Sequence, residues 1–216
     1  MQQINESPGT DRKRPSKTVG ARWVAFELVF LTAMLIAVVA SVYLDVVVWQ
    51  NGLSEKSLTE TLHNLFILCS GILFLIGAKR HPEKRGYLIM VGAFFMILFI
   101  RENDKLLDGI WHGFWSIPAT VALAIAAVPV WLNRKTISKP FLAHYAARDF
   151  VFLYMGFLLL VVFSRLMGTS AIWEAIMQGG YNPMFKTVIQ EGLELLGYSF
   201  ILYGSALSLR IGFSAR

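Results

Sequence analysis

Two carboxylates inside an apolar stretch are the residues of this sequence best suited to chemistry. Glu191 and Glu194 lie within the segment 185–209, which is long enough to cross a membrane. Measured from Lys186 along a helix, they lie about 8 Å and about 12 Å inside it. A charged side chain at the centre of a bilayer costs on the order of 2.5 to 3.5 kcal/mol on insertion scales. Each carboxylate therefore needs a partner, such as a shared proton, an arginine or a metal ion.

The other polar residues of the segment follow the same helical spacing. At 100° per residue, one side of the helix carries Thr187, Glu191, Glu194, Tyr198 and Ser205. We predict that this side forms one wall of a site. Glu191 and Glu194 would act there as acid/base groups or metal ligands, and Tyr198 would contact the substrate.

A second polar stretch, residues 101–112, follows the third apolar segment. If a helix continues through it, one side presents Arg101, Asp104, Lys105, Asp108 and His112 at successive turns. We predict His112 and Asp108 as further catalytic groups and Asp104 as a metal ligand. The alternative is a solvated, self-neutralising turn, with Trp111 and Trp115 in the interfacial aromatic belt.

A third polar group begins the second apolar segment. Glu60, His63 and Asn64 share one helical side there, and Thr59 is expected to cap the helix. The predicted metal ligands are His63, His112, Asp104 and Glu191. Histidines together with carboxylates suit zinc or a harder divalent ion.

Two arginines are the candidates for holding an anionic part of a substrate. Arg101 and Arg165 are expected at the same membrane face as the carboxylates, and we assign them to substrate binding with Tyr198 and Asn64. The four histidines form no HxxxH or HExxH pair, and neither a P-loop nor a GxGxxG sequence occurs. The motifs therefore name no particular reaction.

The elements that must position these residues are membrane helices. The chain is 56% hydrophobic and 16% charged, with a mean hydropathy of +0.56. We predict an all-α, polytopic membrane protein, a bundle of six transmembrane helices. The predicted spans are 23–49, 60–78, 87–103, 113–132, 149–167 and 185–209.

The distribution of lysine and arginine predicts the orientation. Fifteen of the 20 basic residues lie in the N-terminal tail, two alternate connections and the C-terminus. By the positive-inside rule both termini are cytoplasmic, so the polar site opens to the outer, periplasmic face of a bacterial-type inner (plasma) membrane. Because the basic residues are scattered over short loops, nucleic-acid binding is not expected, whereas membrane lipids are expected partners.

The chain is expected to fold as one domain with a tail. Residues 1–21 are polar and basic, which predicts a disordered cytoplasmic tail, and residues 22–216 form the single six-helix domain. Val38, Val39 and Ala40 before Ser41 could mark a signal-peptide cleavage site. The apolar run continues to Trp49, which favours a membrane span.

Three functions remain open at this level. The first is a membrane-embedded enzyme, metal-dependent or acid/base, that acts on a lipid or lipid-linked headgroup. The second is a small proton-coupled transporter, although the polar residues thin out beyond Tyr198 and Ser205. The third is an interaction or assembly subunit, with a protein partner or a second copy, whose polar residues hold helices together.

Overall fold

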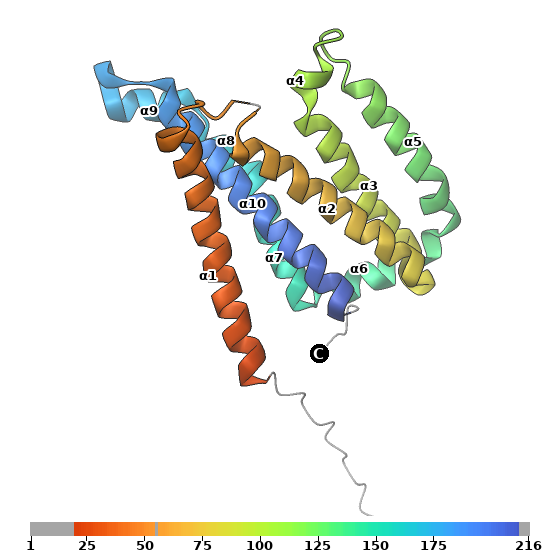
Figure 1. The fold of residues 1–216 in the computed structure, drawn as a ribbon. Coiled ribbons are helices and arrows are strands. Elements are labelled where there is room, and N and C mark those ends of the chain that lie inside the picture. Colours follow the sequence, from red (N-terminus) through yellow and green to blue (C-terminus); the bar gives the residue numbers. More distant parts are fainter. Residues whose placement is uncertain (1–19, 55, 212–216) are drawn as a thin grey trace, which may run out of the picture. The chain divides into compact units, whose positions relative to one another are not determined.

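A computed structural model describes residues 20–54 and 56–211 of this chain (Figure 1). Throughout these residues the regular structure is helical and contains no strand, which confirms the predicted all-α class. The predicted tail, 1–21, lies almost entirely outside the described residues. Backbone contacts divide the chain into two units, 1–33 and 34–216. The first unit contributes the beginning of α1 (Ala21–Tyr43), and the second contains the rest of α1 and all the other helices.

Several helices are long and apolar enough to cross a membrane. Four such segments are Ala21–Val48, Leu58–Arg80, Arg148–Met167 and Pro183–Leu209. A fifth arises if Ser116–Leu132 and Arg134–Tyr145, which meet at a bend of 87°, count as one broken span. The structure thus supports a multi-pass membrane protein with four or five candidate spans.

The segments correspond to helices that begin and end near the predicted limits. They contain α2 (Leu58–Arg80), α5 (Ser116–Leu132), α6 (Ser138–Tyr145), α7 (Arg148–Leu158), α8 (Ser164–Met167) and α10 (Pro183–Ile211). The predicted third span is α3 (Arg85–Glu102), which has only 18 residues and includes Arg85, Arg101 and Glu102. These charges keep α3 out of the candidate spans, so the count of six is not confirmed.

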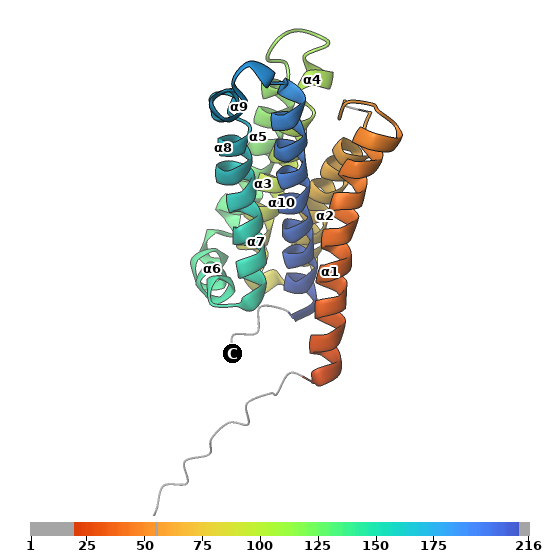
Figure 2. The same cartoon turned by 90° about the vertical axis from the view of Figure 1, so that its left-hand side faces the viewer.

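The second unit is organised around α10. This helix packs against α7 on one side and α2 on the other, and α3 packs between α2 and α5 (Figures 1 and 2). The hydrophobic core of the second unit contains Ile67, Phe74, Leu88, Phe95 and Ile201. Because apolar side chains also face lipid in a membrane, the specificity of such packing comes mainly from shape and from close backbone approach.

The contact between α7 and α10 depends on two glycines. A Cβ atom on Gly156 would lie 2.5 Å from the backbone oxygen of Gly197, and one on Gly197 would lie 3.0 Å from that of Gly156. These backbones therefore approach each other more closely than any side chain would allow. The approach holds the polar side of α10 in register with α7 and α8, which carry the neighbouring wall of the site.

Candidate functional site

A histidine between two carboxylates forms the centre of the candidate site. Glu60 and His63 lie on α2 and Glu191 lies on α10, and one ligand atom from each falls within 4.8 Å of the other two. His63 Nδ1 is 3.7 Å from Glu60 Oε2 and 3.7 Å from Glu191 Oε2. The His63 side chain is 1% exposed, whereas both carboxylates are 20% exposed. We call these three residues the His63 cluster.

The second ring nitrogen fixes the tautomer of His63. Nε2 lies 3.1 Å from the backbone carbonyl oxygen of Glu191. A carbonyl oxygen only accepts hydrogen bonds, so the hydrogen-bond network assigns the proton to Nε2. In the neutral ring, Nδ1 then presents a lone pair to the two carboxylates, and this buried atom has no hydrogen-bond partner.

A proton or a metal ion would stabilise that arrangement. A lone pair facing two negative oxygens is repulsive unless a proton or a metal ion lies between them. Histidine ligands of metals characteristically donate their other N–H group to a backbone carbonyl or a carboxylate, as Nε2 does here. The His63 cluster therefore has the donor set and the orientation of a cation site with three protein ligands.

The start of α2 positions Glu60 and His63, which lie three residues apart and so project from one face. The fully buried Asp45 accepts hydrogen bonds from the backbone N–H groups of Leu58 and Thr59 at 2.9 and 2.7 Å. The Thr59 hydroxyl also donates to Asp45, at 2.7 Å. The predicted cap role of Thr59 is wrong, because Ser57 is the N-cap and accepts from the Glu60 N–H at 3.1 Å.

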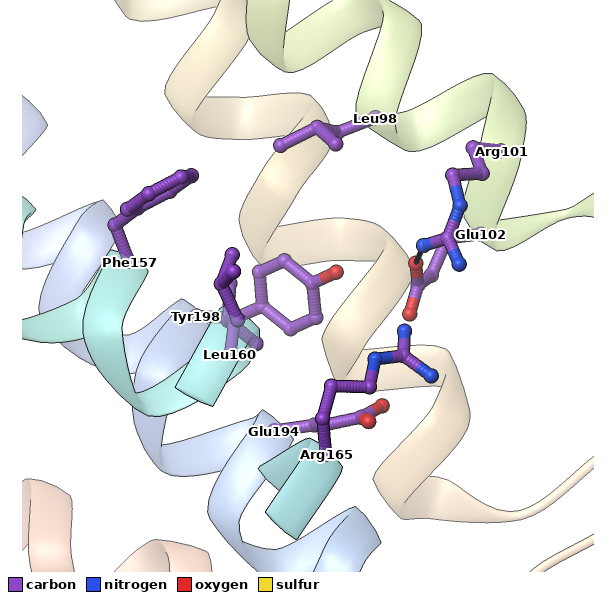
Figure 3. A pocket seen from close by; sticks show the side chains of 9 residues that line it. Leu98, Arg101, Glu102, Phe157, Leu160, Arg165, Glu194 and Tyr198 are labelled. Carbon is purple, nitrogen blue, oxygen red and sulfur yellow. Dashed lines mark ion pairs between the residues drawn. The ribbon is translucent and has the colours of Figure 1, made fainter. Parts of the chain in front are cut away.

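A pocket of about 240 Å³ lies beside the His63 cluster (Figure 3). Its lining residues are Leu98, Arg101, Glu102, Phe157, Leu160, Val161, Arg165, Glu194 and Tyr198. Four of the nine lining residues are apolar, and two of these four come from the π-helical turn Leu159–Phe163. The other five bring two positive and two negative side chains together with a phenol. The pocket thus combines a charged wall with a wall suited to hydrocarbon.

The charged side chains of the pocket face one another. Arg101 Nη1 lies 3.9 Å from Glu102 Oε2. The buried Glu194 accepts a hydrogen bond from Gln190 Nε2 at 3.1 Å. Figure 3 shows the Arg165 guanidinium and the Tyr198 hydroxyl pointing toward the carboxylate of Glu102. Both arginines are exposed, so their N–H groups are accessible to a ligand.

A smaller cavity continues from this pocket along the end of α3. It measures about 50 Å³ and is lined by Glu60, Asn64, Glu102, Asn103, Lys105 and Leu106. Glu102 lines both spaces, and Glu60 belongs both to this cavity and to the His63 cluster. Asn103 donates to Asn64 Oδ1, which joins the end of α3 to α2. The pocket, the cavity and the cluster therefore form one polar region.

Comparison of the chain with protein-family models, with curated proteins and with solved structures gives no significant match. The geometry of the polar region thus carries the functional argument by itself.

Most of the predicted site residues fall within this polar region. His63 and Glu191 meet in the His63 cluster, and Arg101, Arg165, Glu194 and Tyr198 line the pocket. Asn64 lines the smaller cavity. Residues on four helical segments that are far apart in the sequence are thereby brought together.

Three predicted residues lie apart from the His63 cluster. His112 is fully exposed and pairs with Asp108, with Nδ1 and Oδ2 3.3 Å apart, while Asp108 accepts from the Gly113 N–H at 2.9 Å. Asp104 begins the short helix α4 (Asp104–Leu107). No continuous helix runs through this stretch, since α3 ends at Glu102 and Asn103 leaves helical geometry at φ −94° and ψ 24°.

Sequence reasoning gave no role to Glu60, although it placed this residue on the same helical side as His63. The three-residue spacing of Glu60 and His63 is the sequence feature that places Glu60 beside His63, because i and i+3 positions are neighbours on a helix. Within the described part of the chain, Glu60, His63 and Glu191 are the one group of three or more metal-ligating side chains that meets these distances.

A second buried network lies elsewhere on α10. His144 Nδ1 is 2.7 Å from the Tyr87 hydroxyl oxygen, and its Nε2 is 3.1 Å from both Ser208 Oγ and Asp149 Oδ2. His144 is fully buried and Asp149 is 2% exposed in its side chain. The network ties α6, α7 and α3 to α10. Its burial indicates a structural role.

Proposed function

We propose that this protein is a membrane-embedded enzyme that binds a divalent cation at Glu60, His63 and Glu191 and acts on a lipid or lipid-linked headgroup. The observation that carries the proposal is the buried Nδ1 of His63, which presents a lone pair to two carboxylates while Nε2 donates to a backbone carbonyl. One histidine with two carboxylates suits zinc or a harder divalent ion, and three protein ligands are typical of catalytic zinc sites.

The neighbouring side chains supply the remaining functions of such an enzyme. A bound cation would polarise a headgroup oxygen or activate a water molecule. Arg101 and Arg165 would hold an anionic group of the substrate, and Tyr198 would orient it through its hydroxyl group. Glu194, whose carboxylate faces into the same pocket, would transfer a proton to or from the reacting group of the substrate. The exposed His112–Asp108 pair lies outside this arrangement, so the mechanism gives it no step.

The apolar part of the pocket supports a lipid substrate. Leu98, Phe157, Leu160 and Val161 would contact the hydrocarbon next to the headgroup. Val161 is 52% exposed on the outside of the bundle, so this wall reaches the surface that lipid would cover. A headgroup could therefore enter beside the two arginines while its chains stay in the membrane.

We place the pocket at the outer face of a bacterial-type inner membrane. If α3 crosses as a sixth span despite its charged ends, both termini lie on the same face. The positive-inside rule then makes that face cytoplasmic and makes the end that carries the His63 cluster periplasmic. The short α3 would need the polar residues at its ends to lie in the headgroup region.

The alternative is a proton in place of the metal ion. A doubly protonated His63 would also satisfy the two carboxylates through charge-assisted contacts. The same cluster would then serve a proton-coupled transporter, or an assembly subunit in which it joins α2 to α10. The metal content of the purified protein distinguishes the metal-dependent enzyme from the transporter and the assembly subunit.

The deciding experiment measures zinc and manganese in the protein purified in detergent, and their binding to the chelator-treated protein. We expect close to one ion per chain, lost in His63→Ala and Glu191→Gln. His112→Ala is the matched control, because this exposed histidine is apart from the cluster, and it should keep the ion. Failure of the wild-type protein to bind either ion, or equal loss in His112→Ala, would overturn the proposal.

A further inference from the structure

A groove of about 590 Å³ runs along the other side of α3, between α2 and α5. Its lining residues are Leu75, Ala78, Lys79, Arg85, Ile89, Ala93, Met96, Ala122, Ile125, Ala126 and Pro129. None of the residues in this groove belongs to the His63 cluster or to its pocket. All of them are apolar except Lys79 and Arg85, so the groove has a hydrocarbon-like wall and positive charge at one end only.

Small side chains create the space. Ala122 and Ala126 on α5 and Ala93 on α3 line the groove. Small residues spaced in this way favour close helix packing, but of Ala119, Ala122 and Ala126 on α5 only Ala119, 7% exposed, is buried. Beyond Ala119, Ala122 and Ala126 line the groove. The helix α3 packs against both α2 and α5.

The two cations are held where α2 ends and α3 begins. Arg85 Nε donates to the backbone oxygen of Ala78 at 3.2 Å, which fixes the guanidinium at the end of the groove. Lys79 is exposed beside it. None of the lining residues is acidic, and Glu83 in the intervening turn lies 3.3 Å from His81. The positive end of the groove is thus left for a ligand of opposite charge.

We propose that this groove binds one membrane lipid with an anionic headgroup, whose chain lies along α3 and α5 and whose phosphate contacts Lys79 and Arg85. The occupant follows from charge complementarity, because a lipid is apolar along its chain and charged at one end, as the groove is. Basic pockets between membrane helices bind such headgroups, and the volume falls in the usual range of about 300 to 1,000 Å³ for ligand sites. This site is independent of the proposed enzymatic function.

The test compares two lipids with identical chains, phosphatidylglycerol and phosphatidylcholine, in native mass spectrometry of the detergent-purified full chain. We expect the wild-type protein to retain phosphatidylglycerol in preference to phosphatidylcholine. The double variant Lys79→Gln, Arg85→Gln should lose the preference. Arg80→Gln is the matched control, since Arg80 is also basic, exposed and at the end of α2, but does not line the groove.

A second pair of variants tests whether the hydrocarbon chain of the lipid lies in the groove. Ala126→Phe fills the groove and should reduce retention of phosphatidylglycerol to the level of the double variant, whereas Ala127→Leu adds volume at an exposed position of α5 outside the groove and should leave retention unchanged. Thermal unfolding of each variant checks that the helices remain folded. The proposal is overturned if Ala126→Phe binds both lipids like the wild type, if Arg80→Gln has the effect of the double variant, or if a second copy of the chain occupies the groove as a dimer free of lipid.

Discussion

His63 contacts Glu191 through both of its ring nitrogens. Nε2 lies 3.1 Å from the backbone oxygen of Glu191, and Nδ1 lies 3.7 Å from a carboxylate oxygen of the same residue. The first contact fixes the orientation and tautomer of the ring, and the second directs its lone pair to the carboxylate. One residue of α10 thus acts both as the support for a histidine of α2 and as a candidate ligand beside it.

Glu60→Gln is expected to weaken the binding of zinc or manganese by more than about tenfold, because it removes a proposed ligand carboxylate while keeping the size of the side chain, and even partners behind the ligands are worth about tenfold. Isothermal titration of the chelator-treated protein measures the change. Glu174→Gln, a substitution in α9 (Ser170–Met177) that is outside the His63 cluster and lines neither the pocket nor the smaller cavity, serves as the charge-matched control. Equal affinity of Glu60→Gln and wild type would exclude Glu60 as a ligand.

Binding of the metal should also tighten as the pH rises and His63 loses its proton. A proton and a metal ion compete for the same Nδ1 lone pair, so binding releases a proton. Titrations in two buffers of different ionisation enthalpy measure that release. An affinity that is independent of pH would contradict coordination by His63.

Arg165→Ala is expected to raise KM for an anionic lipid substrate, and Arg165→Lys to restore only part of the loss. The guanidinium offers several N–H donors in a fixed plane, whereas an ammonium group is a point charge. The measurement is headgroup release from vesicles of phosphatidylglycerol, with phosphatidylcholine as the neutral comparison. Arg134→Ala is the control, because Arg134 lies over the Trp131 ring, 4.8 Å from its centroid, away from the pocket. An unchanged KM in Arg165→Ala would remove Arg165 from the substrate site.

Asp45→Ala should destabilise the protein by about 1 to 3 kcal/mol, because it leaves the buried N–H groups of Leu58 and Thr59 without their acceptor. Asp45→Asn retains one carbonyl oxygen and should lose less. Thermal unfolding in detergent compares the two variants. A further expectation is weaker metal binding in Asp45→Ala, since the first turn of α2 carries Glu60 and His63. Equal melting temperatures for wild type, Asp45→Ala and Asp45→Asn would show that the hydrogen bonds to Asp45 do not stabilise the protein.

Gly156→Ala should lower the melting temperature markedly, because the added methyl group would lie 2.5 Å from the backbone oxygen of Gly197 and force α7 away from α10. Gly180→Ala is the matched control, since a Cβ atom there meets nothing within 4 Å. Thermal unfolding of the two variants in the same detergent makes the comparison. Similar melting temperatures would mean that α7 and α10 accommodate the added methyl group without loss of stability.

The sequence by itself determined which segments are helical and apolar, and where charge is unexpected within them. Composition and helical spacing were enough to predict an all-α membrane protein and to select His63, Glu191, Glu194 and Tyr198, since both are local properties of the chain. The same local signals could not count the spans, because α3 is short and charged at its ends.

Only the tertiary structure decided which polar residues meet. The partners of His63 depend on how α2 and α10 are rotated against each other, and that rotation is set by contacts between residues distant in the sequence. His112 is exposed beyond the end of α3 at Glu102, whereas Glu191 is brought to His63 and Glu60 by the register of α2 against α10. Spacing along one helix shows which side chains share a face, but packing determines what that face contacts.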